Sequence, residues 1–305
     1  MIRRLEEYAQ ALADAAATAP HPGLLAALWK RTAGGLPGGL TVYDCGGGLL
    51  LAVRRGAAVL LGEPTAAARQ EITAFARFAG IRYLYTAGSV SFSGWKAKPL
   101  VWMACPVDRT APPAATPHTV APLNGYSAAA QLVCGEECEE VRNDFYAELC
   151  SRRNRGIGQV LAIGDPALEA CLVCSGPIPC PPPSAACTLP VQNTGTGCLR
   201  PLLRRLRKLP LLQKLALLRK QAVPAQPPEA PAALLPTVYL SDLFTAPAYR
   251  RARRGEALID AAKRGEGLPP ETQQLVLYCA PELAPYYETL GFIPGGTLRR
   301  WQTAD

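Results

Sequence analysis

Proline is concentrated in two stretches of this 305-residue chain, and these stretches constrain its organisation most. Five of the 30 prolines lie between Cys105 and Leu123, and 13 lie between Ser175 and Pro236. Proline has no backbone N–H and a fixed φ, so such stretches favour extended or irregular chain over helix and central strand. The pattern predicts an N-terminal α+β domain over 1–106, a linker over 107–122, and a C-terminal domain over 123–305 with an insert at 175–236.

The insert also carries most of the net charge. Between Gly176 and Pro236, eight Lys and Arg stand against one Glu, a net of +7 out of +8 for the whole chain. Within it, Leu199–Gln221 is leucine-rich and basic. Contact with an acidic membrane surface or with nucleic acid stays open. A partly ordered, solvated segment is favoured, because exposed charge is the usual state and the absence of aromatic residues weakens a role in base stacking.

The rest of the composition indicates a folded chain. Apolar residues make up 49%, enough for a sizeable core. No apolar run reaches the roughly 18–20 residues of a membrane-spanning helix. The first residues include Glu6, Glu7 and Asp14 and lack the apolar core of a secretion signal. We therefore expect a cytoplasmic protein, whose 11 cysteines are mostly reduced and buried.

A metal site is not expected. Cys171 and Cys174 have the spacing of half a zinc site, but they lie in an apolar strand pattern. The only histidines, His21 and His118, are far away in sequence. Closed structural zinc sites need four well-spaced ligands.

Hydrophobic spacing predicts alternating strands and helices. Short apolar runs predict strands at 40–45, 49–53, 57–61, 81–85, 100–104, 158–163, 167–174, 237–245, 275–279 and 297–302. Helical spacing predicts helices within the first 35 residues and at 66–78, 126–134, 137–152, 249–263 and 281–290. No repeat is visible in the residues, although both halves are compatible with α+β units of similar size.

The run from Leu243 to Leu258 predicts an anion site. A strand ends, Pro247 stops its ladder, and a basic turn leads into a helix with Gly255 in its first turn. Free N–H groups at a helix N-terminus and the helix dipole favour a negative charge there. Four arginines add to this, and a diphosphate would fit, although a solvated basic helix start is an equally good interpretation of this segment alone.

A second cluster, Tyr278–Phe292, reads as a strand, a short helix and a glycine stop. Leu283, Tyr287 and Leu290 fall on one helical face, which directs the Tyr287 ring inward. A tyrosine at such spacing is most often a core aromatic.

Together, the two segments resemble the GNAT superfamily of N-acetyltransferases. Val238–Leu258 is similar to its strand, pyrophosphate loop and helix, usually written with an Arg/Gln-x-x-Gly-x-Gly/Ala core, and Tyr287–Phe292 is similar to its Tyr-Glu-x-Leu-Gly-Phe ending. The resemblance runs from about Leu123 to the C-terminus without the insert, and the upstream half is interpreted as a degenerate, related unit. It implies an α/β (α+β) fold with a mixed, splayed central sheet flanked by helices, plus a smaller N-terminal α+β domain.

The resemblance implies acetyl-CoA as co-substrate, in a V-shaped gap between the strands at 237–245 and 275–279. The expected binding residues are Leu243, Phe244 and Thr245 along the pantetheine arm and Arg250, Arg251, Ala252, Arg253, Arg254, Gly255 and Glu256 around the pyrophosphate.

The resemblance also implies catalytic roles. Tyr287 matches the tyrosine that protonates the leaving thiolate, and a backbone N–H near the splay polarises the thioester carbonyl. The base varies in the family. Asp242 is the candidate here, with Glu139, Glu140 and Asp144 as alternatives. The acceptor pocket is expected from 126–155.

Two departures from the family keep two functions open. Arg253 replaces the first loop glycine, which hinders close approach of the backbone to phosphate unless the guanidinium pairs with it. The insert replaces a tight turn. The leading prediction is an acetyl-CoA-dependent N-acetyltransferase acting on an amine of an unknown acceptor. The alternative is a catalytically impaired GNAT-like module that binds CoA or a macromolecular partner.

Overall fold

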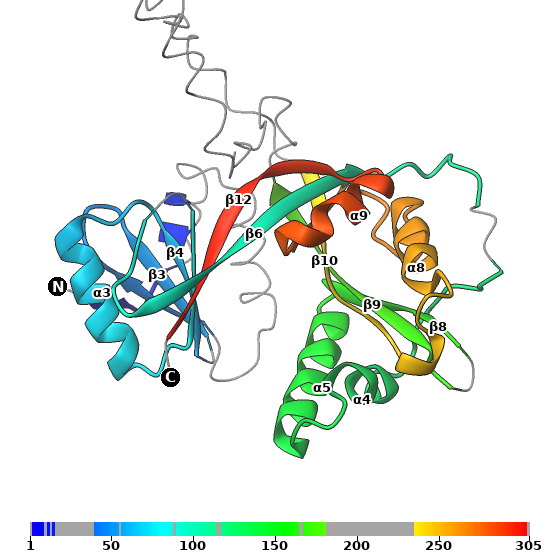
Figure 1. Ribbon diagram of the computed structural model, residues 1–305, viewed down its shortest axis with the longest axis horizontal. Coiled ribbons are helices and arrows are strands. Elements are labelled where there is room, and N and C mark those ends of the chain that lie inside the picture. The colour runs from blue at the N-terminus through cyan, green and yellow to red at the C-terminus, as the bar shows by residue number, and fades with distance from the viewer. Residues whose placement is uncertain are drawn as a thin grey trace, which may run out of the picture. The chain divides into compact units, whose positions relative to one another are not determined.

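The computed structural model describes residues 2–8, 11–12, 14–15, 40–54, 56–87, 90–113, 117–164, 167–180 and 235–303. Within these ranges the strands form one mixed sheet in the order β1-β2-β3-β4-β5-β12-β6-β11-β10-β9-β8-β7 (Figure 1). The helical prediction for the N-terminus is wrong at Arg3–Leu5, which form a strand paired with Val42–Asp44. Most of the rest of that predicted helix and the basic segment 199–221 lie outside the described residues. In the part of the chain that the structure describes, no helix combines the length and the apolar character needed to cross a membrane.

Most predicted elements are confirmed, with shifted ends. The strands are β1 (Arg3–Leu5), β2 (Thr41–Asp44), β3 (Leu50–Arg54), β4 (Ala57–Leu61), β5 (Tyr83–Ala87), β6 (Trp95–Pro106), β7 (Ala121–Pro122), β8 (Gly158–Ile163), β9 (Ala170–Cys180), β10 (Leu235–Thr245), β11 (Gln274–Cys279) and β12 (Ile293–Thr303). The helices are α3 (Ala66–Phe78), α4 (Ser127–Cys134), α5 (Glu139–Asn154), α8 (Arg254–Lys263) and α9 (Ala284–Thr289), with 3₁₀ turns η1 (Pro247–Tyr249) and η2 (Pro281–Leu283).

Three boundaries differ from the sequence prediction for a physical reason. The helix expected over 249–263 begins only at Arg254, because η1 and an irregular turn occupy the residues before it. The strands around the insert run further than expected, since β9 and β10 stay paired out to Cys180 and Leu235. Both ends of the predicted insert therefore belong to strands.

The two halves repeat one topology that the residues do not reveal. In the first half, β2, β3 and β4 are antiparallel, α3 follows, and β5 lies parallel to β4. In the second half, β8, β9 and β10 are antiparallel, α8 follows, and β11 lies parallel to β10. In each half the parallel pairing covers three residues of each strand.

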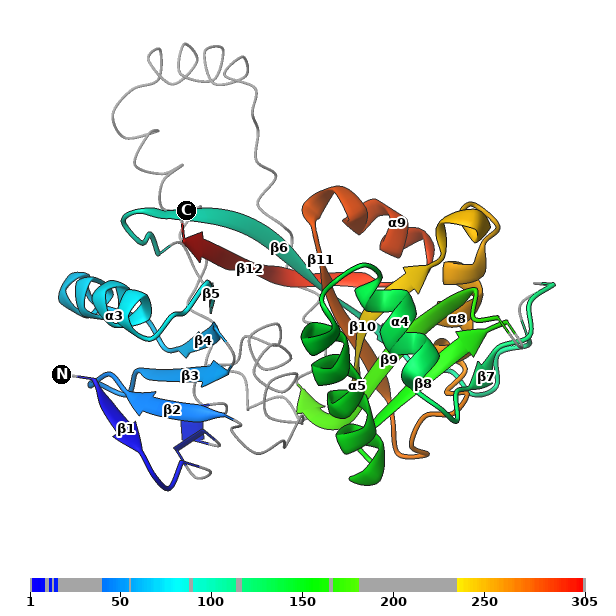
Figure 2. The same ribbon diagram turned by 90° about the horizontal axis from the view of Figure 1, so that it is seen from below.

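The last strand of each half completes the other half (Figure 2). The strand β6 follows β5 in the chain but pairs with β11, and β12 follows β11 but pairs with β5. The two long strands also pair with each other, from Ile293 opposite Ala104 to Thr303 opposite Trp95. Strands from both sides of the linker predicted at 107–122 therefore lie in one sheet. The division of the chain into two domains at that linker stays a prediction.

Helices cover opposite faces of the C-terminal part of the sheet. Leu172 and Leu240 pack with Leu258 of α8, whereas Val160 and Val173 pack with residues of α4 and α5. Successive side chains of a strand point to opposite faces, so the two layers come from alternating positions. Burial of each large aliphatic side chain contributes roughly 1.5–3 kcal/mol.

A buried charged cluster joins β3 to α5. Arg54 Nη1 lies 3.7 Å from Glu148 Oε1, and Arg152 pairs with the same carboxylate one helical turn further on. Arg152 Nη1 also donates to Ser175 Oγ at 2.7 Å. The cluster ties the first half of the sheet to a helix of the second.

Candidate functional site

The strands β10 and β11 separate after a short parallel ladder. They pair only from Thr237 opposite Gln274 to Tyr239 opposite Val276, although both strands continue. Along its other edge β10 stays paired with β9 as far as Thr245, with an irregularity after Ser241. Among the described residues, no strand pairs with the β11-facing edge of β10 beyond Tyr239. The predicted V-shaped gap is therefore present, with an edge that an extended ligand can join.

A cavity of about 190 Å³ lies in this gap. Its lining residues are Leu172, Tyr239, Leu240, Ser241, Asp242, Leu243, Ile259, Leu277, Tyr278 and Tyr287. The fold thus brings Asp242 and Tyr287 to one cavity, although they are far apart in the sequence. The alternative carboxylates Glu139, Glu140 and Asp144 are not among its lining residues.

The Tyr287 hydroxyl is held in its protonated form. The ring packs edge-on against Phe292 and Tyr286, with centroids 5.8 and 5.2 Å away. Burial raises the pKa of Tyr287 to about 12, and Cys279 and Tyr286 add to the shift. Leu283 does not share this packed face, because it lies in the 3₁₀ turn η2 and is 48% exposed.

Sequence reasoning missed a tyrosine cluster beside the cavity. Tyr278 contacts both Tyr239 and Tyr85, with ring centroids 5.4 and 6.0 Å away. Burial is the main cause that raises the pKa of Tyr239 well above its usual value, and the neighbouring Tyr278 raises it further. The alternation along β10 could have assigned Tyr239 to a face. The contact with Tyr85 depends on the exchanged strands, which no local pattern shows.

A second hollow, of about 330 Å³, lies at the start of α8. Its lining residues are Leu243, Thr245, Tyr249, Arg250, Arg251, Arg253, Arg254, Gly255, Glu256 and Tyr286. Leu243 lines both hollows. Two further residues of the expected site, Phe244 and Ala252, line neither hollow, although the contacts expected of them are made by the backbone. The side chain of Phe244 packs on the α4 and α5 face, and the carbonyl of Ala252 accepts a hydrogen bond from His118 Nε2 at 2.7 Å.

The backbone of this turn leaves the start of α8 without a side-chain cap. Arg251 and Arg253 adopt left-handed φ angles of 65° and 57°, and Arg253, the N-cap residue, makes no side-chain cap hydrogen bond. The first N–H groups of α8 are therefore open to an anion. A left-handed φ also explains why glycine suits the position of Arg253 in the family pattern.

Two of the four arginines are already in ion pairs. Arg253 Nε lies 2.5 Å from Glu256 Oε2, and Arg254 Nε lies 2.5 Å from Glu169 Oε2. Glu256 raises the pKa of Arg253 through a hydrogen bond and its charge. Arg250 and Arg251 then supply the excess positive charge around the hollow.

The equivalent part of the first half is built differently. The N-cap residue of α3 is Thr65, whose hydroxyl accepts from the N–H of Ala68. Beside β5, the indole of Trp301 donates to Thr86 Oγ1 at 3.0 Å and packs edge-on against Phe92. The N-terminus of α3 is therefore capped by a side chain, whereas that of α8 is not.

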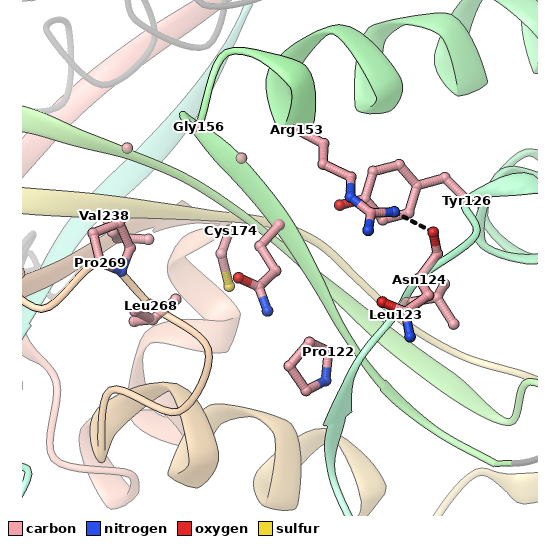
Figure 3. A pocket seen from close by; sticks show the side chains of 13 residues that line it. Pro122, Leu123, Asn124, Tyr126, Arg153, Gly156, Cys174, Val238, Leu268 and Pro269 are labelled. Carbon is pink, nitrogen blue, oxygen red and sulfur yellow. Dashed lines mark hydrogen bonds between the residues drawn. The ribbon is translucent and has the colours of Figure 1, made fainter.

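Another hollow, of about 270 Å³, lies at the paired end of β10 (Figure 3). Val238 and Cys174 line it, together with Tyr126 and Arg153, whose guanidinium lies 5.6 Å from the Tyr126 ring centroid. Arg153 also donates to the carbonyl of Asn124. Asp242, Tyr287 and the α8 turn do not line this hollow, so it is distinct from the candidate site.

The two cysteines of the Cys-x-x-Cys pair are core residues. Cys171 packs on the α4 and α5 face, whereas Cys174 packs on the α8 face, so the two thiols point to opposite sides of β9. Burial raises the pKa of each thiol to about 12. No group of three or more potential metal-ligating side chains occurs among the residues that the structure describes.

Solved structures, two of them of GNAT proteins, resemble this chain over nearly its whole length. A tandem GNAT protein from the clavulanic acid biosynthesis pathway matches with 13% identity and a TM-score of 0.51, covering 100% of this chain and 99% of that protein. A GCN5-related N-acetyltransferase from Kribbella flavida matches with 14% identity and a TM-score of 0.51, covering 93% and 96%. A Drosophila protein matches with 10% identity and a TM-score of 0.52, covering 99% and 98%.

The chain therefore has a GNAT-like fold, as the sequence motifs indicated. The match to a tandem protein covers both halves, in agreement with the repeated topology. No protein-family model matches the sequence, and no curated protein does. At these identities the likeness establishes the fold, and activity has to be argued from the site.

Proposed function

We propose that this protein is an N-acetyltransferase that uses acetyl-CoA to acetylate an amine of an acceptor still to be identified. The observation that carries the proposal is the conjunction of a splayed β10 edge, an uncapped α8 N-terminus beside it, and Tyr287 and Asp242 in the cavity between the strands. Each feature alone has a structural explanation. Their meeting around two hollows that share Leu243 supports binding of an extended, phosphorylated thioester.

The residues present fit acetyl-CoA. The free edge of β10 from Ser241 to Thr245 offers backbone groups to the amides of the pantetheine arm. The α8 N–H groups, with Arg250 and Arg251, offer a positive site for the pyrophosphate. A Cβ at Gly255 would stand 3.6 Å from Leu243 and 3.8 Å from the Tyr286 hydroxyl, in ordinary van der Waals contact with two residues that line the hollow at the start of α8.

The proposed chemistry is direct acyl transfer. Acetyl-CoA supplies an acyl carbon activated as a thioester, so that a C–N bond to the amine forms as the C–S bond breaks. Asp242 accepts the proton that the amine loses, and the Tyr287 hydroxyl donates toward the departing sulfur. A thiol has an ordinary pKa of about 8.5. A phenol with a pKa of about 12 therefore acts mainly by hydrogen bonding to the developing negative charge.

The second candidate function is a binding module without turnover. It is favoured by Arg253, which holds a left-handed conformation that glycine adopts without strain, and whose side chain pairs with Glu256. Such a module would bind CoA or a macromolecular partner and transfer no acetyl group.

Titration calorimetry tests the proposal. We expect micromolar binding of acetyl-CoA and much weaker binding of S-acetylpantetheine, which lacks the phosphates that the α8 turn would hold. Arg250→Ala should weaken acetyl-CoA binding, whereas the control Arg77→Ala on α3 should not. No binding of acetyl-CoA up to millimolar concentration would contradict the enzyme function. Tight binding without acetylation of any amine in a broad screen would favour the module.

A further inference from the structure

Ser241 is a buried hydroxyl that the fold leaves without a partner. Its residue is 8% exposed, and its Oγ atom makes no hydrogen bond within the described residues. Buried hydroxyls are ordinarily hydrogen-bonded, because desolvation is otherwise uncompensated. When such an unpartnered polar atom lies in the wall of a cavity, it indicates that a group of a bound ligand forms the missing hydrogen bond.

The position of Ser241 on β10 is specific. It lies two residues beyond Tyr239, the last residue that pairs with β11, and directly before Asp242, whose φ is 51°. The β9 register breaks at the same place, between Ser241 and Phe244. Ser241 therefore lines the cavity close to the vertex of the gap, in the same wall as Asp242.

We infer that the Ser241 hydroxyl hydrogen-bonds the thioester carbonyl of acetyl-CoA. This inference rests on the proposed function and adds a residue that the motifs do not assign. A pantetheine arm entering from the α8 turn passes Thr245 and then Leu243 before it reaches Ser241. Along an extended strand, Ser241 lies about 13 Å from Thr245. The acyl end is then the part that meets Ser241, next to the Asp242 and Tyr287 side chains that would act on the amine and the sulfur.

A matched control exists in the same molecule. Thr272 is 3% exposed, and its Oγ1 atom is also buried without a hydrogen-bond partner among the described residues. It lies in the turn before β11 and lines neither the cavity between β10 and β11 nor the hollow at the start of α8. If Ser241 is only an imperfectly satisfied core residue, its replacement should behave like replacement of Thr272.

The experiment compares Ser241→Ala and Thr272→Val with the wild type. Each change removes an unpartnered buried hydroxyl, so thermal unfolding should occur at or above the wild-type temperature in both. Calorimetry with acetyl-CoA should show about a tenfold loss of affinity for Ser241→Ala, as expected for one hydrogen bond, and none for Thr272→Val. Affinity for CoA, which lacks the acetyl carbonyl, should be unchanged in both variants.

The possible results separate the two proposals. If the wild type does not bind acetyl-CoA, the proposed function fails and this inference fails with it. If the wild type binds and Ser241→Ala binds equally well, the inference alone is overturned. Equal losses for acetyl-CoA and CoA overturn the assignment to the thioester carbonyl. A lower unfolding temperature specific to Ser241→Ala shows that the hydroxyl stabilises the fold instead.

Discussion

Removal of the Glu148 carboxylate should destabilise the protein strongly, because this group lies between two buried guanidinium groups. The side chains of Arg54, Glu148 and Arg152 are 5%, 18% and 3% exposed. Breaking a buried ion pair typically costs about 3–5 kcal/mol, since an uncompensated charge is left behind. The partial exposure of Glu148 places the expected cost of Glu148→Gln near the lower limit, about 3 kcal/mol.

Thermal unfolding provides the assay. For a domain of 150–250 residues, 1 kcal/mol shifts Tm by about 2–4 °C, so Glu148→Gln should lower Tm by roughly 6–12 °C. The control is Glu140→Gln in the first turn of the same helix, where the carboxylate is exposed. Its interaction with the helix dipole contributes about 0.3–1 kcal/mol, so a shift of at most about 4 °C is expected. In the double variant Arg54→Met/Glu148→Gln, one positive charge is removed with the negative one, so part of the loss should be recovered.

Two results would refute this reasoning. If Glu148→Gln and Glu140→Gln melt at the same temperature, the cluster is solvated in solution and does not tie β3 to α5. If the double variant is less stable than Glu148→Gln, Arg54 contributes by packing, and its charge is not the source of the cost.

The remaining predictions concern the candidate site. Tyr287→Phe should leave acetyl-CoA affinity near normal and lower kcat by about 10²-fold or more; an unchanged kcat would remove the tyrosine from this role. Because burial raises the pKa of Tyr287 to about 12, the folded state holds this proton more tightly than the unfolded state. Its contribution to stability is therefore complete below pH 10 and lost between about pH 10 and 12, by up to about 1.4 kcal/mol per pH unit. Urea unfolding at pH 9 and pH 11 should show a smaller decrease for Tyr287→Phe than for the wild type. Arg253→Gly should keep or improve both Tm and acetyl-CoA affinity, because glycine adopts the left-handed φ without strain; a large loss of affinity would show that the guanidinium itself binds phosphate.

Local patterns in the sequence predicted much of the secondary structure and the fold class. The helix at Ala66–Phe78 and the strands at Gly158–Ile163 and Ala57–Leu61 have the predicted ends. Their spacing depends on contacts within a few residues, which the sequence displays directly. The ending Tyr287–Phe292 and the basic turn before Gly255 indicated a GNAT-like fold in the same way, and the solved structures confirm that fold.

Tertiary structure alone decided which strands meet. The pairing of β12 with β5 joins residues more than 200 positions apart, and no local pattern encodes such a contact. The exchange of β6 and β12 revealed the repeat of the two halves and brought Tyr85 to Tyr278. The splay of β10 from β11 placed Asp242 and Tyr287 around one cavity and left Ser241 in its wall without a hydrogen-bond partner among the described residues.

The two helix starts show the same division. The sequence gives both α3 and α8 a plausible polar beginning, with Thr65 in one and Arg253 in the other. The side chains already distinguish them, because the Thr65 hydroxyl accepts a hydrogen bond from its own helix, whereas the Arg253 guanidinium can only donate and leaves its helix without a side-chain cap. Sequence therefore determined where helices and charges lie along the chain. Packing determined that the start of α8 lies beside the splayed end of β10, where Leu243 and Thr245 line the hollow at this helix N-terminus.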